Sequence, residues 1–96
     1  MKRDYEVGLV VRLDPSDEVI NESITQVQGW IGSIAQGSVS GMDRWGRRKL
    51  AYEVDNQREG YYVFLKANME STTLPELERT LNLAPAILRY LIVQPD

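Results

Sequence analysis

The sequence predicts a single α+β domain in which two helices cover one face of a four-stranded antiparallel sheet. Alternating apolar residues mark the strands, and apolar residues spaced by three and four mark the helices. In chain order these segments follow the pattern β-α-β-β-α-β, without internal repeats or a linker. A chain of 96 residues is long enough to fold alone, so we expect one domain over residues 1–96.

The first strand and the first helix are expected before residue 38. Apolar side chains alternate from Tyr5 to Leu13, which is typical of a strand with one buried face. Residues 14–17, Asp-Pro-Ser-Asp, predict a helix start because they offer a capping side chain, a proline and acids near the positive end of the helix dipole. We expect the helix to stop at Gly37, where a positive φ would suit a C-terminal cap. Its apolar stripe comprises Ile20, Ile24, Val27, Ile31 and Ile34.

A long antiparallel hairpin is expected in the middle of the chain. Residues 50–54 alternate in its first arm, and residues 55–60 form a polar reversal. Residues 61–69 then alternate as a strand that is largely apolar on both faces. Gly41 and Gly46 lie in the first arm, where each is expected to interrupt the ladder by a bulge or a close backbone approach.

The second helix and the last strand follow the hairpin. Thr73 and Glu76 have the spacing of a capping box, and the helix is expected to end near Asn82. Residues 87–93 form a nearly continuous apolar strand that is interrupted by Arg89. The short apolar stripe of the second helix contains Leu74, Leu77 and Leu81.

This order of elements predicts the ferredoxin-like split β-α-β arrangement. We expect right-handed crossovers, with the first and third strands in the middle of the sheet. The core should lie between the sheet and the two helices. Its predicted members are Val7, Leu9, Val11, Ile20, Ile24, Val27, Ile31, Ala67, Met69, Leu77 and Leu81.

Composition excludes several classes of function. The chain contains neither cysteine nor histidine, which removes disulfides, thiolate nucleophiles, Cys/His zinc sites and the commonest general base. We find no nucleophile elbow and no phosphate-binding glycine loop, so we expect no catalytic residues, no metal and no cofactor. No apolar run is long enough to span a bilayer, and no signal peptide is recognised, so a cytoplasmic protein is expected.

Charge is distributed unevenly along the chain. The net charge of -3 argues against broad, non-specific nucleic-acid binding, which normally needs an excess of Lys and Arg. Acidic residues cluster between positions 14 and 22, whereas basic residues cluster between positions 44 and 49. A local field can outweigh net charge, so the second cluster is a candidate phosphate-binding surface, the alternative being a merely solvated face. We define this basic block as Arg44, Trp45, Arg47, Arg48 and Lys49.

The strand after the hairpin turn partly matches the pattern of an RNA-recognition motif. Residues 60–64, Gly-Tyr-Tyr-Val-Phe, would put Tyr62 and Phe64 on one face, where they could stack on bases. The matching row of the first strand has no aromatic residue and carries Glu6, whose carboxylate would repel RNA. A single-stranded RNA-binding module is therefore the alternative function, and packing is the alternative role of the two rings.

Three ordered motifs resemble the bacterial small-subunit ribosomal protein six family over the whole chain. They are Arg-Asp-Tyr-Glu-Val at 3–7, Trp-Gly-Arg-Arg-Lys-Leu-Ala-Tyr at 45–52 and Gly-Tyr-Tyr-Val at 60–63. The chain departs from the family pattern at Glu53 and Val54, where Pro-Ile is frequent, and the printed sequence lacks the long C-terminal tail of some members.

The resemblance implies a structural protein of the small ribosomal subunit, and not an enzyme. Such a protein would bind the central domain of the small-subunit ribosomal RNA together with ribosomal protein eighteen. Matching the motifs residue by residue implies that Arg3 and four residues of the basic block, Trp45, Arg47, Arg48 and Lys49, lie near the RNA or the partner protein. Arg44 precedes the motif and is predicted as an RNA contact from its charge.

The strands also leave apolar side chains on the sheet face away from the helices. Uncovered apolar surface of this kind marks an interaction site, so we expect ribosomal protein eighteen to cover it. The predicted contact residues are Val10, Tyr62, Phe64, Leu91 and Val93.

Overall fold

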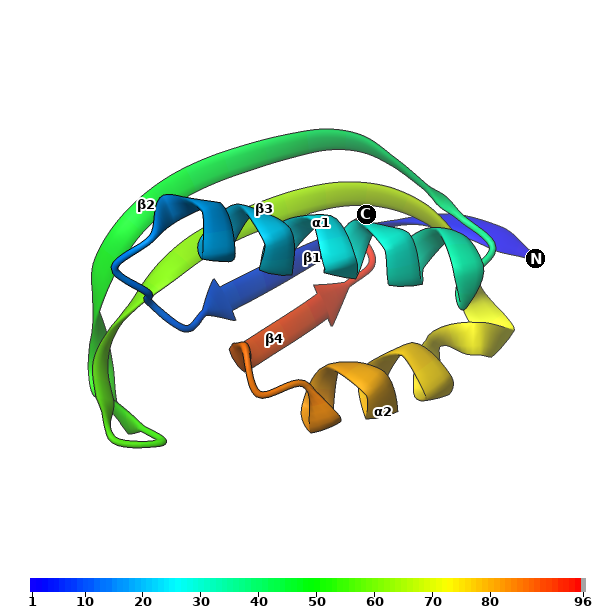
Figure 1. Cartoon of the computed structure of the whole chain (residues 1–96). Helices are drawn as coiled ribbons and strands as arrows, with labels where there is room; N and C mark the ends of the chain where they lie inside the picture. Colours follow the sequence, from blue (N-terminus) through cyan, green and yellow to red (C-terminus); the bar gives the residue numbers. More distant parts are fainter. Residues whose placement is uncertain (96) are drawn as a thin grey trace.

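Two helices lie on one face of a single sheet (Figure 1). The computed structural model describes residues 1–95. Its four strands are arranged in the order β2-β3-β1-β4, and each neighbouring pair is antiparallel. The predicted ferredoxin-like fold, with the first and third strands in the middle, is confirmed. The elements are β1 (Lys2–Val11), α1 (Asp17–Ser33), β2 (Ser38–Val54), β3 (Gln57–Glu70), the 3-10 helix η1 (Ser71–Thr73), α2 (Leu74–Leu83) and β4 (Ile87–Val93).

The register of the central pair determines which side chains share a face. The ladder of β1 and β3 runs without interruption from Lys2 opposite Glu70 to Val11 opposite Tyr61. β4 pairs with the other edge of β1, and β2 pairs with the other edge of β3. Directly opposed residues in neighbouring strands point to the same face of a sheet. The register therefore assigns each strand residue either to the helix side or to the uncovered side.

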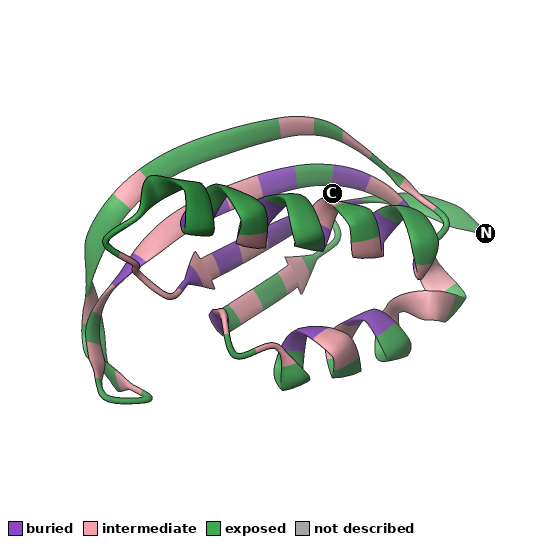
Figure 2. Cartoon of the chain, viewed as in Figure 1, coloured by how far each residue is buried: buried purple, intermediate pink, exposed green. Residues whose placement is uncertain are grey.

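The hydrophobic core lies between the sheet and the helices, as predicted. Figure 2 shows the buried positions along β1 and β3 and on the helix surfaces turned toward them. Every residue that the sequence predicted for the core is buried. The core also contains five residues that the prediction left out, namely Tyr5, Ala35, Val63, Leu65 and Ile87.

The hairpin of β2 and β3 reverses more tightly than predicted. Asp55 and Asn56 alone form the turn, with φ values of 51° and 62°, and β3 already begins at Gln57. Positive φ at both central residues is typical of the two-residue turns that match strand twist. The expected reversal over 55–60 was wrong because polarity at the exposed end of a hairpin does not distinguish turn from strand.

Bulges interrupt the ladder of β2 and β3 where glycines were expected to do so. The register shifts between Val39 and Gly41, and again between Arg44 and Gly46. Gly46 has a φ of 81°, which few other residues adopt without strain. Each extra residue changes the face on which the following side chains lie.

The end of α1 differs from the prediction. The left-handed conformation belongs to Gln36, with a φ of 51°, and not to Gly37. Gly37 instead allows a close approach of two backbones, because a Cβ atom there would lie 2.1 Å from the carbonyl oxygen of Asn68. At the other end of α1, no side-chain cap forms, and the Asp14 carboxylate accepts the backbone N–H of Ser16 at 2.9 Å.

The predicted capping box of α2 is absent. Thr73 is the residue before the helix, but its side chain makes no capping bond to the first turn. Its hydroxyl donates to the backbone oxygen of Glu70 at 2.7 Å, because the preceding residues coil into η1. Within residues 1–95, neither helix is long and apolar enough to cross a membrane.

Candidate protein and RNA interfaces

The sheet surface opposite the helices, which we call the open face, carries a band of apolar side chains. The helix-facing residues of β1 and β3 are buried, so the alternate residues, including Val10 and Phe64, belong to the open face. Val10 pairs with Tyr62, while Gly8 pairs with Leu91, which is 63% exposed. All residues predicted to contact a protein partner lie on this face: Val10, Tyr62, Phe64, Leu91 and Val93.

Trp45 also belongs to the open face, although basic residues surround it in the sequence. Its indole packs on the ring of Phe64, with centroids 4.6 Å apart and an angle of 54° between the planes. The indole N–H donates to the Asp43 carboxylate at 3.2 Å. Half of the Trp45 side chain remains exposed. The structure thus groups Trp45 with the aromatic residues of β3.

The strand register divides the cations of the basic block between the two sides of β2. Arg44 pairs with Val63 and Arg47 pairs with Tyr61, both on the helix side of β3. Consistent with this, the Arg44 guanidinium donates to the side-chain oxygen of Asn21 on α1.

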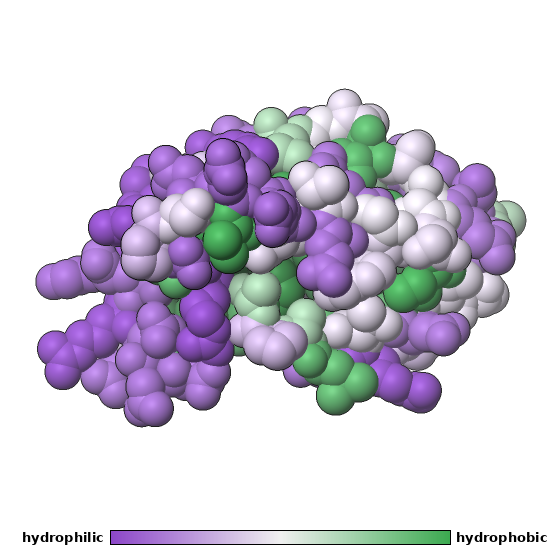
Figure 3. Space-filling model, in the orientation of Figure 1, coloured by the Kyte–Doolittle hydropathy of each residue, from purple (hydrophilic) through white to green (hydrophobic). Residues whose placement is uncertain are grey.

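Arg48, in contrast, is opposite Gly60 on the open-face side, whereas Lys49 is opposite Glu59 and returns to the helix side. All four cations are exposed at the hairpin end of the molecule, where hydrophilic residues gather in Figure 3. The sequence predicted one basic surface, whereas the structure places these cations on both sides of the edge strand β2.

Arg3 lies far from the basic block. It pairs with Met69, whereas Arg47 pairs with Tyr61, eight residues away along β3. At 3.4 Å per residue this corresponds to roughly 27 Å. Arg3 and the basic block would therefore contact separate sites on any ligand.

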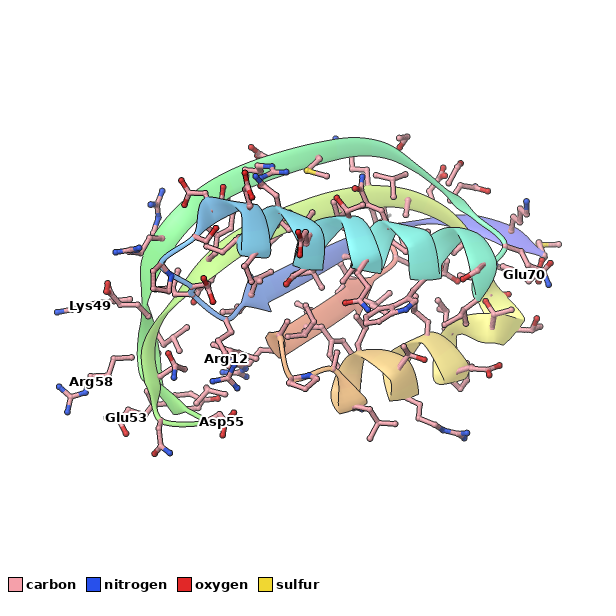
Figure 4. All side chains as sticks on the ribbon, in the orientation of Figure 1. Arg12, Lys49, Glu53, Asp55, Arg58 and Glu70 are labelled. Atoms are coloured by element: carbon pink, nitrogen blue, oxygen red, sulfur yellow. The ribbon has the colours of Figure 1, made fainter. Side chains whose placement is uncertain are left out.

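None of these predicted RNA-contacting cations forms an ion pair within residues 1–95. The ion pairs of the described chain join Arg12 to Asp55, Arg58 to Glu53, and the N-terminal amine to Glu70. Figure 4 shows Lys49 and Arg58 projecting outward from the hairpin, and Arg12 beside the hairpin tip. The charges of the basic block are consequently available to an external anion.

The structure adds two residues to the open face that the sequence did not predict as site residues. The Arg89 guanidinium donates to the Tyr52 hydroxyl, and its central carbon lies 5.1 Å from the centroid of the Tyr52 ring. This contact joins β2 and β4, the two edges of the sheet, because the hairpin end curves around the end of β1 (Figure 1). In the sequence, Arg89 alternates with Leu91 and Val93, which were predicted to lie on this face. This alternation could have identified Arg89 as an open-face residue.

Two hollows adjoin on the open face, and Phe64 lines both of them. The first has a volume of about 520 Å³ and lies beside Trp45, with Glu6, Asp43 and Lys66 at its walls. The second has a volume of about 320 Å³ and is bounded by Val10, Tyr62, Arg89 and Leu91. An aromatic and aliphatic surface with hollows of this size suits a macromolecular partner with protruding side chains.

Residues 4–94 match the family described as ribosomal protein S6. This chain belongs to the ribosomal protein S6 family. Family members are structural proteins of the ribosome, so the prediction that the chain is not an enzyme is confirmed. The small-subunit, cytoplasmic location expected from the sequence is confirmed as well.

Individual S6 proteins are similar to this chain over nearly their whole length. Small ribosomal subunit protein bS6 of Natranaerobius thermophilus is 38% identical over 94 residues, which cover 98% of this chain and 97% of the relative. That of Thermoanaerobacter pseudethanolicus is 37% identical, with 98% of each chain covered. The crystal structure of 30S ribosomal protein S6 from Thermotoga maritima has a TM-score of 0.88 at 25% identity, covering 99% of this chain and 89% of that one.

Proposed function

We propose that this S6-family protein binds the central domain of the small-subunit ribosomal RNA together with ribosomal protein eighteen. The observation that carries the proposal is the presence of two surfaces of different character. One consists of the cations along β2 that form no ion pair within the described residues, and the other of the uncovered apolar side chains of the open face. Cations without acidic partners suit RNA phosphates. Exposed apolar surface suits a protein partner.

The two surfaces have different residues. Open-face side chains would contact ribosomal protein eighteen, and Trp45, expected near RNA from the sequence, is better suited to this protein surface because it packs on Phe64. The RNA surface would comprise Arg3, Arg44, Arg47, Arg48 and Lys49.

Shared binding also accounts for the charge of the chain. A protein with a net charge of -3 is poorly suited to bind RNA alone, because non-specific affinity comes mainly from phosphate neutralisation. A partner that contributes further cations and shape complementarity would reduce the number of phosphate contacts required from this chain. The proposal therefore predicts weak RNA binding by the isolated protein and strong binding by the pair.

A gel-shift experiment with central-domain ribosomal RNA tests this proposal. RNA is titrated with the protein alone, with ribosomal protein eighteen alone, and with both. We expect a stable shift only with both proteins, and amide chemical-shift changes at Val10, Tyr62 and Leu91 when ribosomal protein eighteen is added without RNA. An undisturbed open face at saturating partner would contradict the proposed protein surface.

A single-stranded RNA-binding module remains the second candidate, because Tyr62 and Phe64 lie on the open face as in an RNA-recognition motif. Two observations favour the first candidate: Trp45 covers part of Phe64, and the carboxylates of Glu6 and Asp43 line the adjoining hollow. Shifts of the Tyr62 and Phe64 signals on addition of single-stranded RNA alone would reverse this preference.

A further inference from the structure

The hollow beside Trp45 combines an aromatic wall with carboxylates. Glu6 is opposite Lys66 in the register of β1 and β3, and Asp43 is opposite Phe64 in that of β2 and β3. The two acids thus come from the strands on either side of β3 and are offset by two residues along it, which puts their backbones roughly 12 Å apart. Trp45 lies on the Asp43 side. A side chain that enters this hollow would meet an indole and a carboxylate on one side and a second carboxylate on the other.

The charge of this hollow favours cations. Two carboxylates line it against the single ammonium of Lys66. Neither Glu6 nor Asp43 is ion-paired within the part of the chain that the structure describes. The stem of Lys66 lies over Gly41, where a Cβ atom would be 3.7 Å from the Lys66 Cβ and Cδ atoms. Lys66 is therefore directed toward β2, and because the two carboxylates outnumber its single ammonium, a phosphate would meet a net negative wall.

The indole of Trp45 is held in position for a cation. Contact with Phe64 supports one part of the ring system, and the N–H bond to Asp43 fixes its orientation, while half of the side chain stays exposed. Tryptophan is the best aromatic residue for a cation–π contact, and arginine is its commonest partner because the planar guanidinium also binds carboxylates through two N–H groups. The open face already contains such a contact in Arg89 over Tyr52.

We propose that the hollow receives an arginine side chain of the protein that covers the open face. The guanidinium stacks on the Trp45 indole and binds between the carboxylates of Glu6 and Asp43. This inference rests on the proposed function in one respect, namely that a protein covers this face. It adds the chemistry of the contact and separates the protein surface from the RNA surface, since the same carboxylates repel phosphates.

Binding of purified ribosomal protein eighteen by calorimetry tests the proposal. The variant Glu6→Gln with Asp43→Asn removes both charges while it preserves side-chain shape. The matched control, Glu22→Gln with Glu76→Gln, makes the same change of charge on α1 and α2, away from the open face. We expect the first variant to weaken binding about tenfold or more, as buried charge pairs at interfaces do, and the control to change binding less than twofold.

A second measurement reports on the hollow itself. The indole N–H resonance of Trp45 is followed with that of Trp30 as an internal reference, while arginine amide, citrulline amide or a single-stranded oligonucleotide is added. We expect arginine amide to shift only the Trp45 signal, and this shift to disappear in the Glu6→Gln, Asp43→Asn variant. Citrulline amide, which has the same length but a neutral ureido group in place of the guanidinium, should cause no comparable shift.

The outcomes separate the inference from the proposed function. If wild-type protein fails to bind ribosomal protein eighteen, the proposed function fails and the inference falls with it. Equal binding by the wild type and a folded Glu6→Gln, Asp43→Asn variant would overturn the inference and leave the proposed function standing. A shift of the Trp45 signal by the oligonucleotide and not by arginine amide would likewise overturn it, because the hollow would then accept a base.

Discussion

The Trp45 indole packs on the Phe64 ring at a centroid distance of 4.6 Å, and this contact joins edge strand β2 to central strand β3 on the open face. It forms beside the bulge between Arg44 and Gly46, where the regular ladder is interrupted. A residue in the middle of a basic sequence thereby becomes part of an apolar surface.

Replacing Trp45 tests the contribution of this contact to stability. Trp45→Ala should lower the free energy of unfolding by about 0.5 to 1.5 kcal/mol, the range for aromatic pairs. Trp45→Phe, which preserves a ring over Phe64, should lose less. Urea unfolding followed by circular dichroism measures both variants. An unchanged midpoint for Trp45→Ala would mean that the two rings do not stabilise the strand pair.

Core packing is tested on the inner face of α1. Ile24 is fully buried, so Ile24→Ala should cost about 2 to 5 kcal/mol, through lost burial and the remaining cavity. Thr25→Ala on the exposed side of the same helix is the control and should change stability by no more than about 0.5 kcal/mol. Thermal melts that coincide for the two variants would contradict the placement of Ile24 on the buried face of α1.

Two glycines should respond to alanine in opposite directions. Gly37→Ala would bring a Cβ atom to within 2.1 Å of the Asn68 carbonyl oxygen, which must move, so a loss of about 1 to 3 kcal/mol or more is expected. Gly29 lies within α1, and an added Cβ atom would meet nothing within 4 Å, so Gly29→Ala should stabilise the protein by about 0.5 to 1 kcal/mol. Chemical denaturation of both variants under one set of conditions provides the comparison.

The basic block is tested through the salt dependence of RNA binding. Phosphate contacts release counterions, so Arg47→Glu with Arg48→Glu should flatten the plot of log K against log salt by roughly one to two units for the protein bound with its partner. Arg58→Glu with Arg79→Glu makes the same change of charge outside the block and should leave the slope unaltered. Identical slopes for all proteins, with intact thermal melts, would assign the two arginines to a merely solvated surface.

Glu70 predicts a specific pH dependence of stability. The hydrogen bond from the N-terminal amine is the main cause that lowers the pKa of its carboxyl, and a backbone bond from Thr72 adds to the effect. A carboxyl with a lowered pKa stabilises the folded state above its unfolded pKa, and this contribution is lost as the pH falls through the folded pKa. The difference in unfolding free energy between wild type and Glu70→Gln should therefore be present at neutral pH and vanish in acid. A difference that persists unchanged in acid would contradict this, with Glu76→Gln as the control for loss of one carboxylate.

Local periodicity in the sequence determined the elements and the core. Side chains that face the same way recur at a fixed period within one strand or one helix. The alternation along β1 and β3 and the spacing from Ile20 to Ile31 therefore identify a buried face without any information from the rest of the chain. The bulges at Gly41 and Gly46 were also predictable, because glycine marks them directly. The same residues that define these patterns, together with three short motifs, pointed to the family.

Contacts between distant residues were decided by the tertiary structure alone. Each bulge changes the face on which the following side chains lie, so the sequence could not show that Arg44 reaches α1 while Trp45 packs on Phe64. Curvature of the hairpin brings Tyr52 to Arg89 although β2 and β4 are opposite edges of the sheet. Such pairings depend on register, bulge position and sheet twist together, and no local pattern in the chain encodes that combination.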